Sequence, residues 1–272
     1  MSEEKYLEAR HKTVRKANEL IQRSRFDLTI QQQKILLYLI SRISPYDEDF
    51  KEYEFSIPEF CKVCGIDETN GKNYKNLKEA IKEIADKSLW APHWNPKRNV
   101  YEETLYRWIE KPYMDENSGI IRIKLDNDMK PFLLQLKQNF TQYELIFTLY
   151  FKSKYSIRLY ELVKSIHFHE MEEYTRTYTL DELRKLLDAE TYKTFQHFKD
   201  RALGPAVKEI NEHSDKQITC EFKKTGRAYT DVVFTIRTKP TLEVIRIRDQ
   251  IDKELGTDQL SLWDQLEEAR LV

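Results

Sequence analysis

Residues 55–60 (FSIPEF) and 178–183 (YTLDEL) share one pattern: an aromatic, a hydroxyl, an apolar residue, and a glutamate three positions after the hydroxyl. Two further blocks recur in the same order. Residues 28–39 (LTIQQQKILLYL) resemble residues 140–150 (FTQYELIFTLY), and residues 74–77 (YKNL) resemble residues 192–195 (YKTF). Blocks that repeat in order at similar spacing are typical of an internal duplication. The sequence therefore predicts two diverged copies of one domain.

The repeated blocks also carry signals for the start of a helix. A Ser or Thr followed three residues later by Glu or Gln is the capping-box pattern, in which the hydroxyl accepts a hydrogen bond from a free helical N–H. For any single pair, the alternative is that an unrelated helix matches the capping-box pattern by chance. Four such pairs occur at corresponding places of the two copies: Thr29 and Gln32, Ser56 and Glu59, Thr141 and Glu144, and Thr179 and Glu182.

Within each copy the pattern predicts helices followed by a β-hairpin. In the second copy, helices follow Thr141 and Thr179, and a third covers about residues 192–211. Residues 218–222 alternate between apolar and polar, a turn is expected at residues 224–227, and residues 232–236 form the returning strand. In the first copy we expect a longer hairpin, with strands within 100–111 and 120–125. Three helices and a hairpin make a winged helix.

The predicted fold class is therefore α+β, with two tandem winged-helix domains related by duplication. We expect the first domain to span residues 1–128 and the second residues 129–240, because Asp128-Met129-Lys130-Pro131 interrupts the pattern. Residues 241–272 lie outside the repeat and are expected to form a C-terminal helix and a tail.

Composition excludes several classes of protein. Charged residues are 33% and hydrophobic residues 40% of the 272 positions, which is typical of a globular chain. There is no phosphate-binding GxxxxGK[ST] or GxGxxG pattern, no apolar run long enough to span a membrane, and no signal peptide. We expect a cytoplasmic protein with no cofactor and no membrane partner. The net charge is −1, but basic residues gather near 10–25, 72–87, 193–201 and 216–227, which permits nucleic-acid binding.

The third helix of a winged helix enters the major groove of DNA, and its hairpin contacts the flanking backbone. In the first copy this helix covers about residues 74–86, and helical spacing places Leu77, Ala80, Ile81 and Ile84 on its apolar face. The candidate DNA contacts fall on another arc. A solvated face of mixed charge is the alternative, because Glu79, Glu83 and Asp86 border the arc. The candidates are Lys72, Lys75, Lys78 and Lys82.

In the second copy the helix and the hairpin both offer candidates. Arg201 is the best candidate for bidentate recognition of guanine, whereas lysines suit phosphate contacts. Phe195, Phe198, Ala202 and Val207 are available to the core, and Gly204-Pro205 should kink or split the helix. The helix candidates are Lys193, Thr194, His197, Lys199 and Arg201, and those of the hairpin are Lys223, Lys224 and Arg227.

Two patterns could suggest an enzyme or a metal site. Cys61 and Cys64 form a single CxxC, for which two buried thiols are the simpler interpretation, because no second pair exists and Cys220 is remote. His167-Phe168-His169 is similar to the metal site of rolling-circle nucleases, but no Tyr-x-x-Lys occurs in the chain. The sequence therefore predicts a DNA-binding protein without enzymatic activity and without a metal.

Taken together, these features resemble the initiator replication protein family of iteron-binding plasmid initiators, over nearly all of residues 13–238. The landmarks are residues 14–21 (VRKANELI) with the helix after Thr29, residues 153–162 (SKYSIRLYEL), and residues 198–210 followed by the turn at 224–227 and the strand at 233–236. The third landmark departs from the family at Asp200, which interrupts a run of basic residues found in related initiators.

The resemblance implies that both domains bind one iteron, from two successive faces of the major groove. It implies that monomers activate the origin, whereas dimers joined through the first domain repress the protein's own gene. It also implies that Ser156 and Arg158 touch phosphates and that the helix at 193–201 is the main reader. A transcription regulator with the same two winged helices and no role in replication is the alternative.

Two regions are candidates for protein partners. The strand at 100–109 has an edge that could pair with a second copy of the chain, unless Tyr101, Tyr106 and Trp108 fill the core instead. The tail resembles the short peptide with which bacterial replication proteins bind the sliding clamp. A short helix that packs Leu260, Trp263 and Leu266 on the body is the alternative. The clamp candidates are Gln259, Leu260, Ser261, Leu262 and Trp263.

Overall fold

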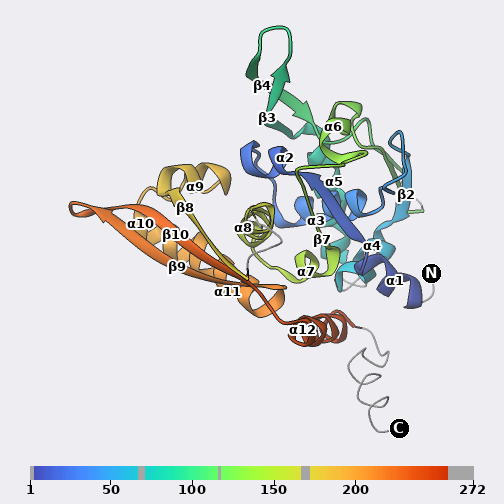
Figure 1. The fold of residues 1–272 in the computed structure, drawn as a ribbon. Helices are drawn as coiled ribbons and strands as arrows, with labels where there is room; N and C mark the ends of the chain where they lie inside the picture. Colours follow the sequence, from blue (N-terminus) through green and yellow to red (C-terminus); the bar gives the residue numbers. More distant parts are fainter. Residues whose placement is uncertain (1–2, 67–70, 116–117, 167–171, 257–272) are drawn as a thin grey trace.

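The computed structural model describes residues 3–66, 71–115, 118–166 and 172–256. It contains two winged helices and a C-terminal helix (Figure 1), so the predicted fold class is confirmed. The second winged helix carries a long β-hairpin that reaches well beyond its helices, and another hairpin projects from the first (Figure 1). The two domains share a continuous apolar core.

The first winged helix has the order helix, strand, two helices and wing. Its short strand pairs antiparallel with the returning strand of the wing, so the sheet order is β2-β6-β5. The Ser56 hydroxyl accepts a hydrogen bond from the Glu59 N–H, as the cap pattern predicted. The elements are α3 (Ile30–Ser41), β2 (Tyr53–Ser56), α4 (Ile57–Cys64), α5 (Gly71–Asp86), β5 (Tyr113–Met114) and β6 (Ile120–Ile123).

The second winged helix repeats this order. Its sheet order is β8-β10-β9, and the Thr179 hydroxyl caps α9 by accepting from the Glu182 N–H. The predicted hairpin is confirmed with longer strands than expected. The elements are α8 (Lys154–Ser165), β8 (Glu173–Thr179), α9 (Leu180–Leu186), α10 (Phe195–Phe198), η2 (Lys199–Leu203), α11 (Gly204–His213), β9 (Lys216–Thr225) and β10 (Ala228–Thr238).

The helix that corresponds to α3 is α8, not the segment after Thr141. Thr29 caps α3 with a full capping box, and Ser153 caps α8 by accepting from the Tyr155 N–H. At the other end, Ser41 and Ser165 each donate their hydroxyl to the carbonyl three residues earlier. The duplication is thus preserved at both ends of the first helix of each domain.

The predicted cap at Thr141 is wrong, because this residue lies inside a strand. β7 (Phe140–Glu144) pairs antiparallel with β1 (Thr13–Ala17), and the Thr141 hydroxyl donates to Asn18 Oδ1 at 2.6 Å. Residues on the two sides of the predicted boundary at 128 are therefore in contact, because β7 belongs to one sheet with the N-terminal strand β1. Around this pair lie α1 (Glu3–Arg10), α2 (Asn18–Arg23), η1 (Asn127–Met129), α6 (Lys130–Leu133) and α7 (Leu145–Tyr150).

The predicted pairing of residues 100–111 with residues 120–125 holds only at an isolated antiparallel bridge between Ile109 and Leu125. β4 (Val100–Arg107) pairs with β3 (Ser88–Asn95) instead of with the wing, so this hairpin is inserted between α5 and the wing. Pro92 lies within β3, where it pairs with Glu103. A proline cannot donate to a sheet ladder, but an edge strand tolerates it. The proline is the reason that the strand was missed in the sequence.

The C-terminal helix α12 (Thr241–Glu254), predicted after Pro240, connects the end of the second domain to the start of the first (Figure 1). The guanidinium of Arg10, almost fully buried, donates to the carbonyls of Lys62, Val63 and Leu255 at 2.8–3.0 Å and pairs with Asp252 at 3.2 Å. A guanidinium has five N–H groups in a fixed fork, so one side chain can join these segments.

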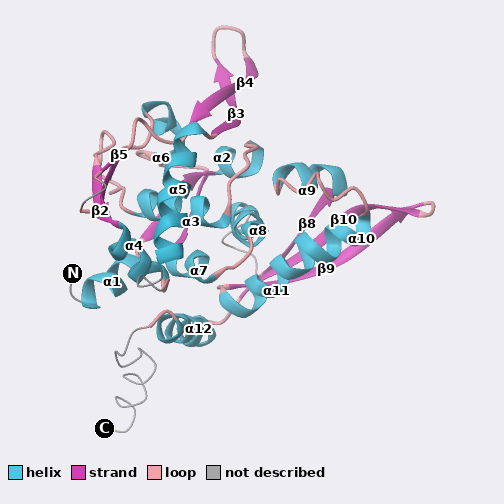
Figure 2. Ribbon diagram, turned by 180° about the vertical axis from the view of Figure 1, so that it is seen from behind, coloured by secondary structure: helices cyan, strands magenta, loops and turns pink. Residues whose placement is uncertain are grey.

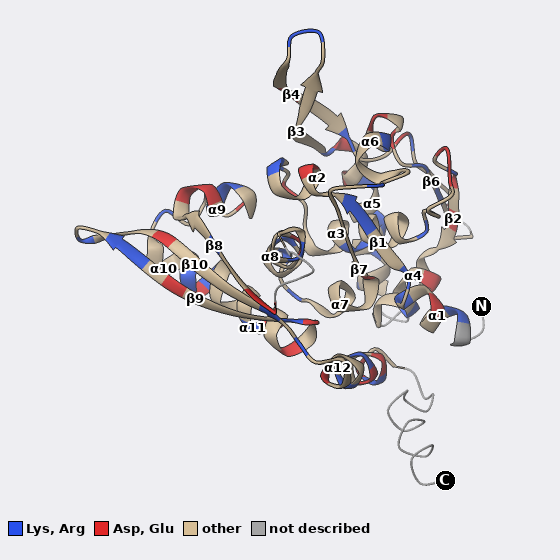
Figure 3. Cartoon of the chain, in the orientation of Figure 1, with Lys and Arg blue, Asp and Glu red and all other residues tan. Residues whose placement is uncertain are grey.

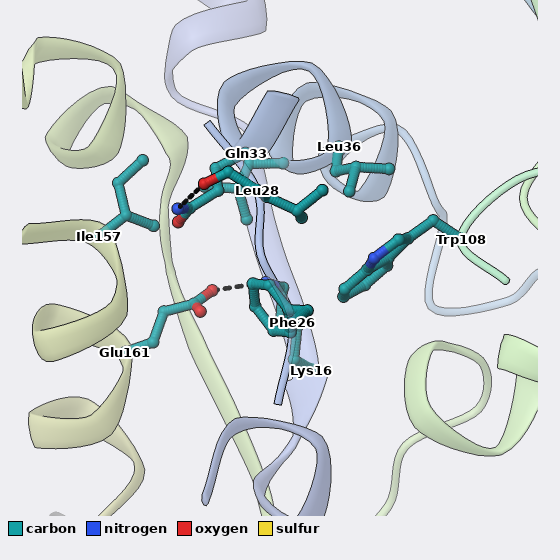
Figure 4. A pocket seen from close by; sticks show the side chains of 9 residues that line it. Lys16, Phe26, Leu28, Gln33, Leu36, Trp108, Ile157 and Glu161 are labelled. Carbon is teal, nitrogen blue, oxygen red and sulfur yellow. Dashed lines mark hydrogen bonds and ion pairs between the residues drawn. The ribbon is translucent and has the colours of Figure 1, made fainter. Parts of the chain in front are cut away.

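A buried ionic cluster joins α8 to the sheet of β1 and β7. Glu161 of α8, 1% exposed, accepts from Tyr143 at 2.5 Å and pairs with Lys16 of β1 at 2.6 Å and with Arg158 at 3.6 Å. Figure 4 shows Lys16 and Glu161 beside a cavity of about 10 Å³ that Phe26 and Trp108 also line. That volume is about the size of one water molecule, too small for a ligand.

Candidate nucleic-acid interface

The third helix of the second winged helix runs from Phe195 to His213 with one irregular turn. The Thr194 hydroxyl caps it by accepting from the His197 N–H at 3.2 Å. Gly204 donates its N–H to the Lys199 carbonyl, five residues earlier, which is the π-helical bond of η2. A Cβ at Gly204 would lie 2.9 Å from that carbonyl oxygen, so glycine is needed there. The expected break at Gly204-Pro205 is therefore a π turn in a continuous helix.

This helix has one buried face and one exposed face along its whole length. Phe198, Ala202, Leu203, Ala206 and Ile210 are at most 1% exposed and fill the core. The expected core residues Phe195 and Val207 are only half-buried. The polar candidates all lie on the exposed face, as required for DNA contact: Lys193, Thr194, His197, Lys199 and Arg201.

The wing is a long hairpin whose strands join at a tight turn. Gly226 has a φ of 63°, a left-handed conformation that favours glycine. Side chains of a strand alternate between its two faces. Lys224 therefore shares the face of Phe222, which packs toward the helix, whereas Lys223 lies on the opposite face. Arg227, at the turn, is exposed.

Three rings join the helix to the wing. Phe195 at the start of the helix stacks on Tyr229 of β10, with ring centroids 4.0 Å apart, and meets Phe222 of β9 edge-on at 5.0 Å. Lys224 Nζ lies 4.3 Å from the centroid of the Tyr229 ring, and Lys199 Nζ lies 5.5 Å from that of Phe222. Two cations from different elements are thus held at one junction. Neither Phe222 nor Tyr229 was a predicted site residue.

Within the described residues the cations of this surface form no ion pair, although Asp231 lies directly across the sheet from Lys223. Asp200, which interrupts the basic run, accepts a hydrogen bond from Gln196 at 2.7 Å and not from Lys199 or Arg201. Figure 3 shows basic residues at the tip of the β9–β10 hairpin and along the helix beside it. Among the described residues, no acidic group forms an ion pair with Lys193, Lys199, Arg201, Lys223, Lys224 or Arg227.

The third helix of the first domain, α5, has the apolar face that the sequence predicted. Its buried residues are Leu77, Ala80, Ile81 and Ile84. On the polar side, Lys72, Lys75 and Lys82 are exposed and Lys78 is half-buried. Lys82 lies 3.6 Å from Glu79, so part of this face carries mixed charge. Figure 2 brings α5 and the α10–α11 helix to the near side of the molecule.

Ser156 and Arg158, expected to touch phosphates, are buried instead. Ser156 is 0% and Arg158 is 4% exposed. The Arg158 guanidinium donates to the carbonyls of Ile21, Ser24 and Leu186 at 3.1–3.3 Å. It also lies over the Phe26 ring, 4.4 Å from its centroid. Arg158 thus holds α2, α8 and α9 together, and neither side chain reaches a surface in this arrangement.

The two cysteines of the CxxC pattern are buried in α4. Burial raises the pKa of the Cys64 thiol to about 12, so the free thiol is protonated at neutral pH. Cys61 is buried as well. Groups of His, Cys, Asp and Glu suited to a metal ion are absent from the part of the chain that the structure describes. His167 and His169 lie outside the described residues.

Two regions were predicted to contact protein partners, and the structure describes only one of them. In the projecting hairpin, Tyr101 is 53% exposed, whereas Tyr106 and Trp108 are buried in the core. The clamp candidates Gln259, Leu260, Ser261, Leu262 and Trp263 lie outside the described residues. None of the described helices has both the length and the apolar composition needed to cross a membrane.

Comparison with known proteins identifies the family. A family model described as Initiator Replication protein, WH1, matches residues 13–164, and one described as Initiator Rep protein, WH2, matches residues 179–236. The chain belongs to the initiator replication protein family. A similar curated protein is a replication initiation protein of Escherichia coli, 26% identical over 251 residues that cover 90% of this chain and 76% of the relative.

The fold is shared with a solved initiator. The Pi initiator protein, in a crystal structure with iteron DNA, superposes with a TM-score of 0.67 at 19% identity, over 85% of this chain and 98% of that one. The WH1 family match extends to residue 164, in agreement with the pairing of β7 and β1. The family favours replication over the alternative of a dedicated transcription regulator.

Proposed function

We propose that this chain initiates plasmid replication by binding directly repeated sites at an origin. Its membership of the initiator family gives the process, and the unpaired cations at the junction of η2 and the wing support the DNA contact most directly. The Pi initiator, which shares the fold, was crystallised with iteron DNA. Neutralising phosphates releases counterions, so a surface of free cations supplies affinity in a salt-dependent way.

In this proposal the second winged helix is the main reader. Lys193, Thr194, His197, Lys199 and Arg201 lie in the major groove, and Lys223, Lys224 and Arg227 hold the flanking backbone. Lys72, Lys75, Lys78 and Lys82 of α5 contact a second groove face. Ser156 and Arg158 are not included, because both are buried.

A pair of single variants tests this surface with a duplex that the full chain selects from random-sequence DNA. Arg201→Ala should cost about 1–3 kcal/mol and relax the preference at one base pair. Lys224→Ala should weaken binding on all sequences and lower the salt slope by about one. Lys208→Ala, exposed on the same helix but near Glu212 at 3.9 Å, is the control. If both test variants bound the duplex with the affinity of the parent, the DNA-binding surface would lie elsewhere on the protein.

The protein acts by binding and not by cutting DNA, in our proposal. Incubation with supercoiled plasmid that carries the selected site, together with Mg²⁺ or Mn²⁺, should leave the DNA supercoiled. Relaxed product that disappears in a His167→Ala, His169→Ala variant would contradict this and identify a nicking enzyme. We place this activity in the cytoplasm, where plasmids replicate.

We also propose that the projecting hairpin joins two chains into the dimer that represses the gene. β4 has no second partner strand among the described residues, and Val100, Tyr101 and Leu105 are 44–53% exposed. An unpaired strand edge with apolar side chains is a template for pairing with a second copy. Leu105→Glu should raise the monomer fraction in sedimentation, whereas Tyr46→Glu, at a 91% exposed site elsewhere, should not. An equal fraction for both would count against this interface.

The tail supports recruitment of host replication proteins. In our proposal Leu260, Leu262 and Trp263 enter an apolar pocket of the sliding clamp, and Gln259 and Ser261 contact its rim. A pull-down should retain the host clamp with the intact chain and lose it with a Leu262→Ala, Trp263→Ala double variant. Equal retention by both would show that the tail has another role.

A further inference from the structure

The rings of Phe195, Phe222 and Tyr229 lie where the wing leaves the body of the protein. Tyr229 is 39% exposed, and Phe195 and Phe222 are half-buried at the edge of the core, so the rings lie at the border between core and surface. Beyond this point the β9–β10 hairpin continues without β8, whose pairing with β10 ends at Asp231 (Figure 1). A two-stranded ribbon alone is only marginally stable. A contact at this level therefore limits how far the tip can swing relative to the helix.

Two lysines depend on the same rings. Lys224 Nζ lies 4.3 Å from the Tyr229 centroid and Lys199 Nζ 5.5 Å from the Phe222 centroid. A cation over a ring face is attracted to the ring and keeps its other side open to solvent. The rings thus restrict where each ammonium lies without covering it, which suits a phosphate contact.

The first winged helix has a related contact. Gly119, at the turn of its wing, has a φ of 67°, and a Cβ there would lie 2.6 Å from Tyr74 Oη of α5. Tyr74 precedes the buried Leu77 by the same spacing as Phe195 precedes the buried Phe198. In both domains an aromatic residue near the start of the third helix therefore touches the wing.

We propose that the three rings form a joint that sets the angle between the wing and the reading helix, with Tyr229 as the positioning residue for Lys224. The proposal rests on the DNA-binding function proposed above and deepens it. Preorganising a charged group before binding lowers the entropy lost on association. The ligand is the phosphate backbone of duplex DNA beside the groove that the helix reads.

The test uses the full chain and the selected duplex, over a range of salt concentrations. Tyr229→Ala should weaken binding roughly threefold to tenfold and lower the salt slope by about one, like Lys224→Ala. Tyr229→Phe keeps the ring face and should bind like the parent. The double variant Tyr229→Ala, Lys224→Ala should be weaker than Lys224→Ala alone by clearly less than the full effect of Tyr229→Ala, because much of the ring's effect passes through the lysine. Circular dichroism should show parental folding, since the ring is partly exposed.

The possible results distinguish a failure of the ring-joint proposal from a failure of the proposed DNA-binding surface. If Lys224→Ala weakens binding but Tyr229→Ala does not, or if their effects add in full, the joint is wrong and the surface stands. If Tyr229→Phe is as weak as Tyr229→Ala, the hydroxyl and not the ring face matters, and the joint is again wrong. If neither Lys224→Ala nor Arg201→Ala changes binding, the proposed surface and the joint fail together.

Discussion

The third helices of the two winged helices have the same role in the fold but present different surfaces. α5 is a regular helix of 16 residues in which Lys82 lies near Glu79 and Glu83 accepts a hydrogen bond from Gln32. The α10–α11 helix contains a π turn, and Lys199 and Arg201 lie within that turn. π turns occur often at functional sites because they displace the helical register. In our proposal the first of these helices supplies a supporting DNA contact and the second reads the sequence.

The buried ionic cluster around Glu161 supports both surfaces. Its disruption should have the largest effect on the stability of the protein. Glu161→Ala leaves Lys16 and Arg158 buried without their carboxylate, which costs about 3–5 kcal/mol. We expect unfolding at much lower denaturant concentration, because the cluster joins α8 to the N-terminal strand β1. Glu173→Ala, which removes an exposed pair with Arg237, should cost under about 1 kcal/mol. Similar losses in the two variants would show that the cluster does not hold α8 against β1.

Matched double variants test the difference between the helices directly. Lys199→Ala, Arg201→Ala should weaken binding to the selected duplex by about 2–4 kcal/mol, because it removes one base contact and one phosphate contact. Lys75→Ala, Lys82→Ala should cost under about 1 kcal/mol, since Lys82 is already near an acidic neighbour. Fluorescence anisotropy at fixed salt measures both. A larger loss from the first-domain variant would reverse the assignment of the main reader.

A smaller effect should come from the C-terminal helix, which connects the two domains. Burial lowers the pKa of His11, but hydrogen bonds with Asp252 and Glu144 outweigh this and raise it from 6.5 to about 9. The charged form therefore stabilises the fold fully below about pH 6.5, and that contribution is lost as pH rises through 9. Because the side chain is about one-third exposed, we expect a loss of only about 1 kcal/mol.

Chemical unfolding at pH 6.5 and pH 9.5 measures this contribution. The parent should lose stability between the two values, and His11→Asn should lose about 1 kcal/mol less. His93→Asn, at an exposed position of β3, is the control and should retain the parental dependence. A parental pH dependence in His11→Asn would remove the proposed role of the His11–Asp252 contact.

Features set by local sequence could be predicted. The caps at Thr29, Ser56 and Thr179, the apolar face of α5 and the turn at Gly226 all depend on residues a few positions apart. In each case the residues that interact in the fold are also close together in the sequence, so a short sequence pattern was sufficient to predict the feature.

Features that depend on distant partners could not be predicted. Thr141 fits a cap pattern, but pairing of β7 with β1 draws it into a strand. The family resemblance implied a phosphate contact for Arg158, yet the side chain is buried and donates to the carbonyls of Ile21 and Ser24. The ring joint was missed because Phe222 and Tyr229 meet only when the hairpin closes. Alternation in β9, which places Phe222 and Lys224 on one face, was the available signal.

The central claim is that two winged helices of one chain bind a single site. The direct measurement is a hydroxyl-radical and methylation-protection footprint of the full chain on direct repeats from the origin beside its gene. We expect each repeat to show two protected major-groove patches about one helical turn, or 34–36 Å, apart. In Lys199→Ala, Arg201→Ala the patch of the second domain should be lost first. A single patch of a few base pairs per repeat would contradict binding by both domains.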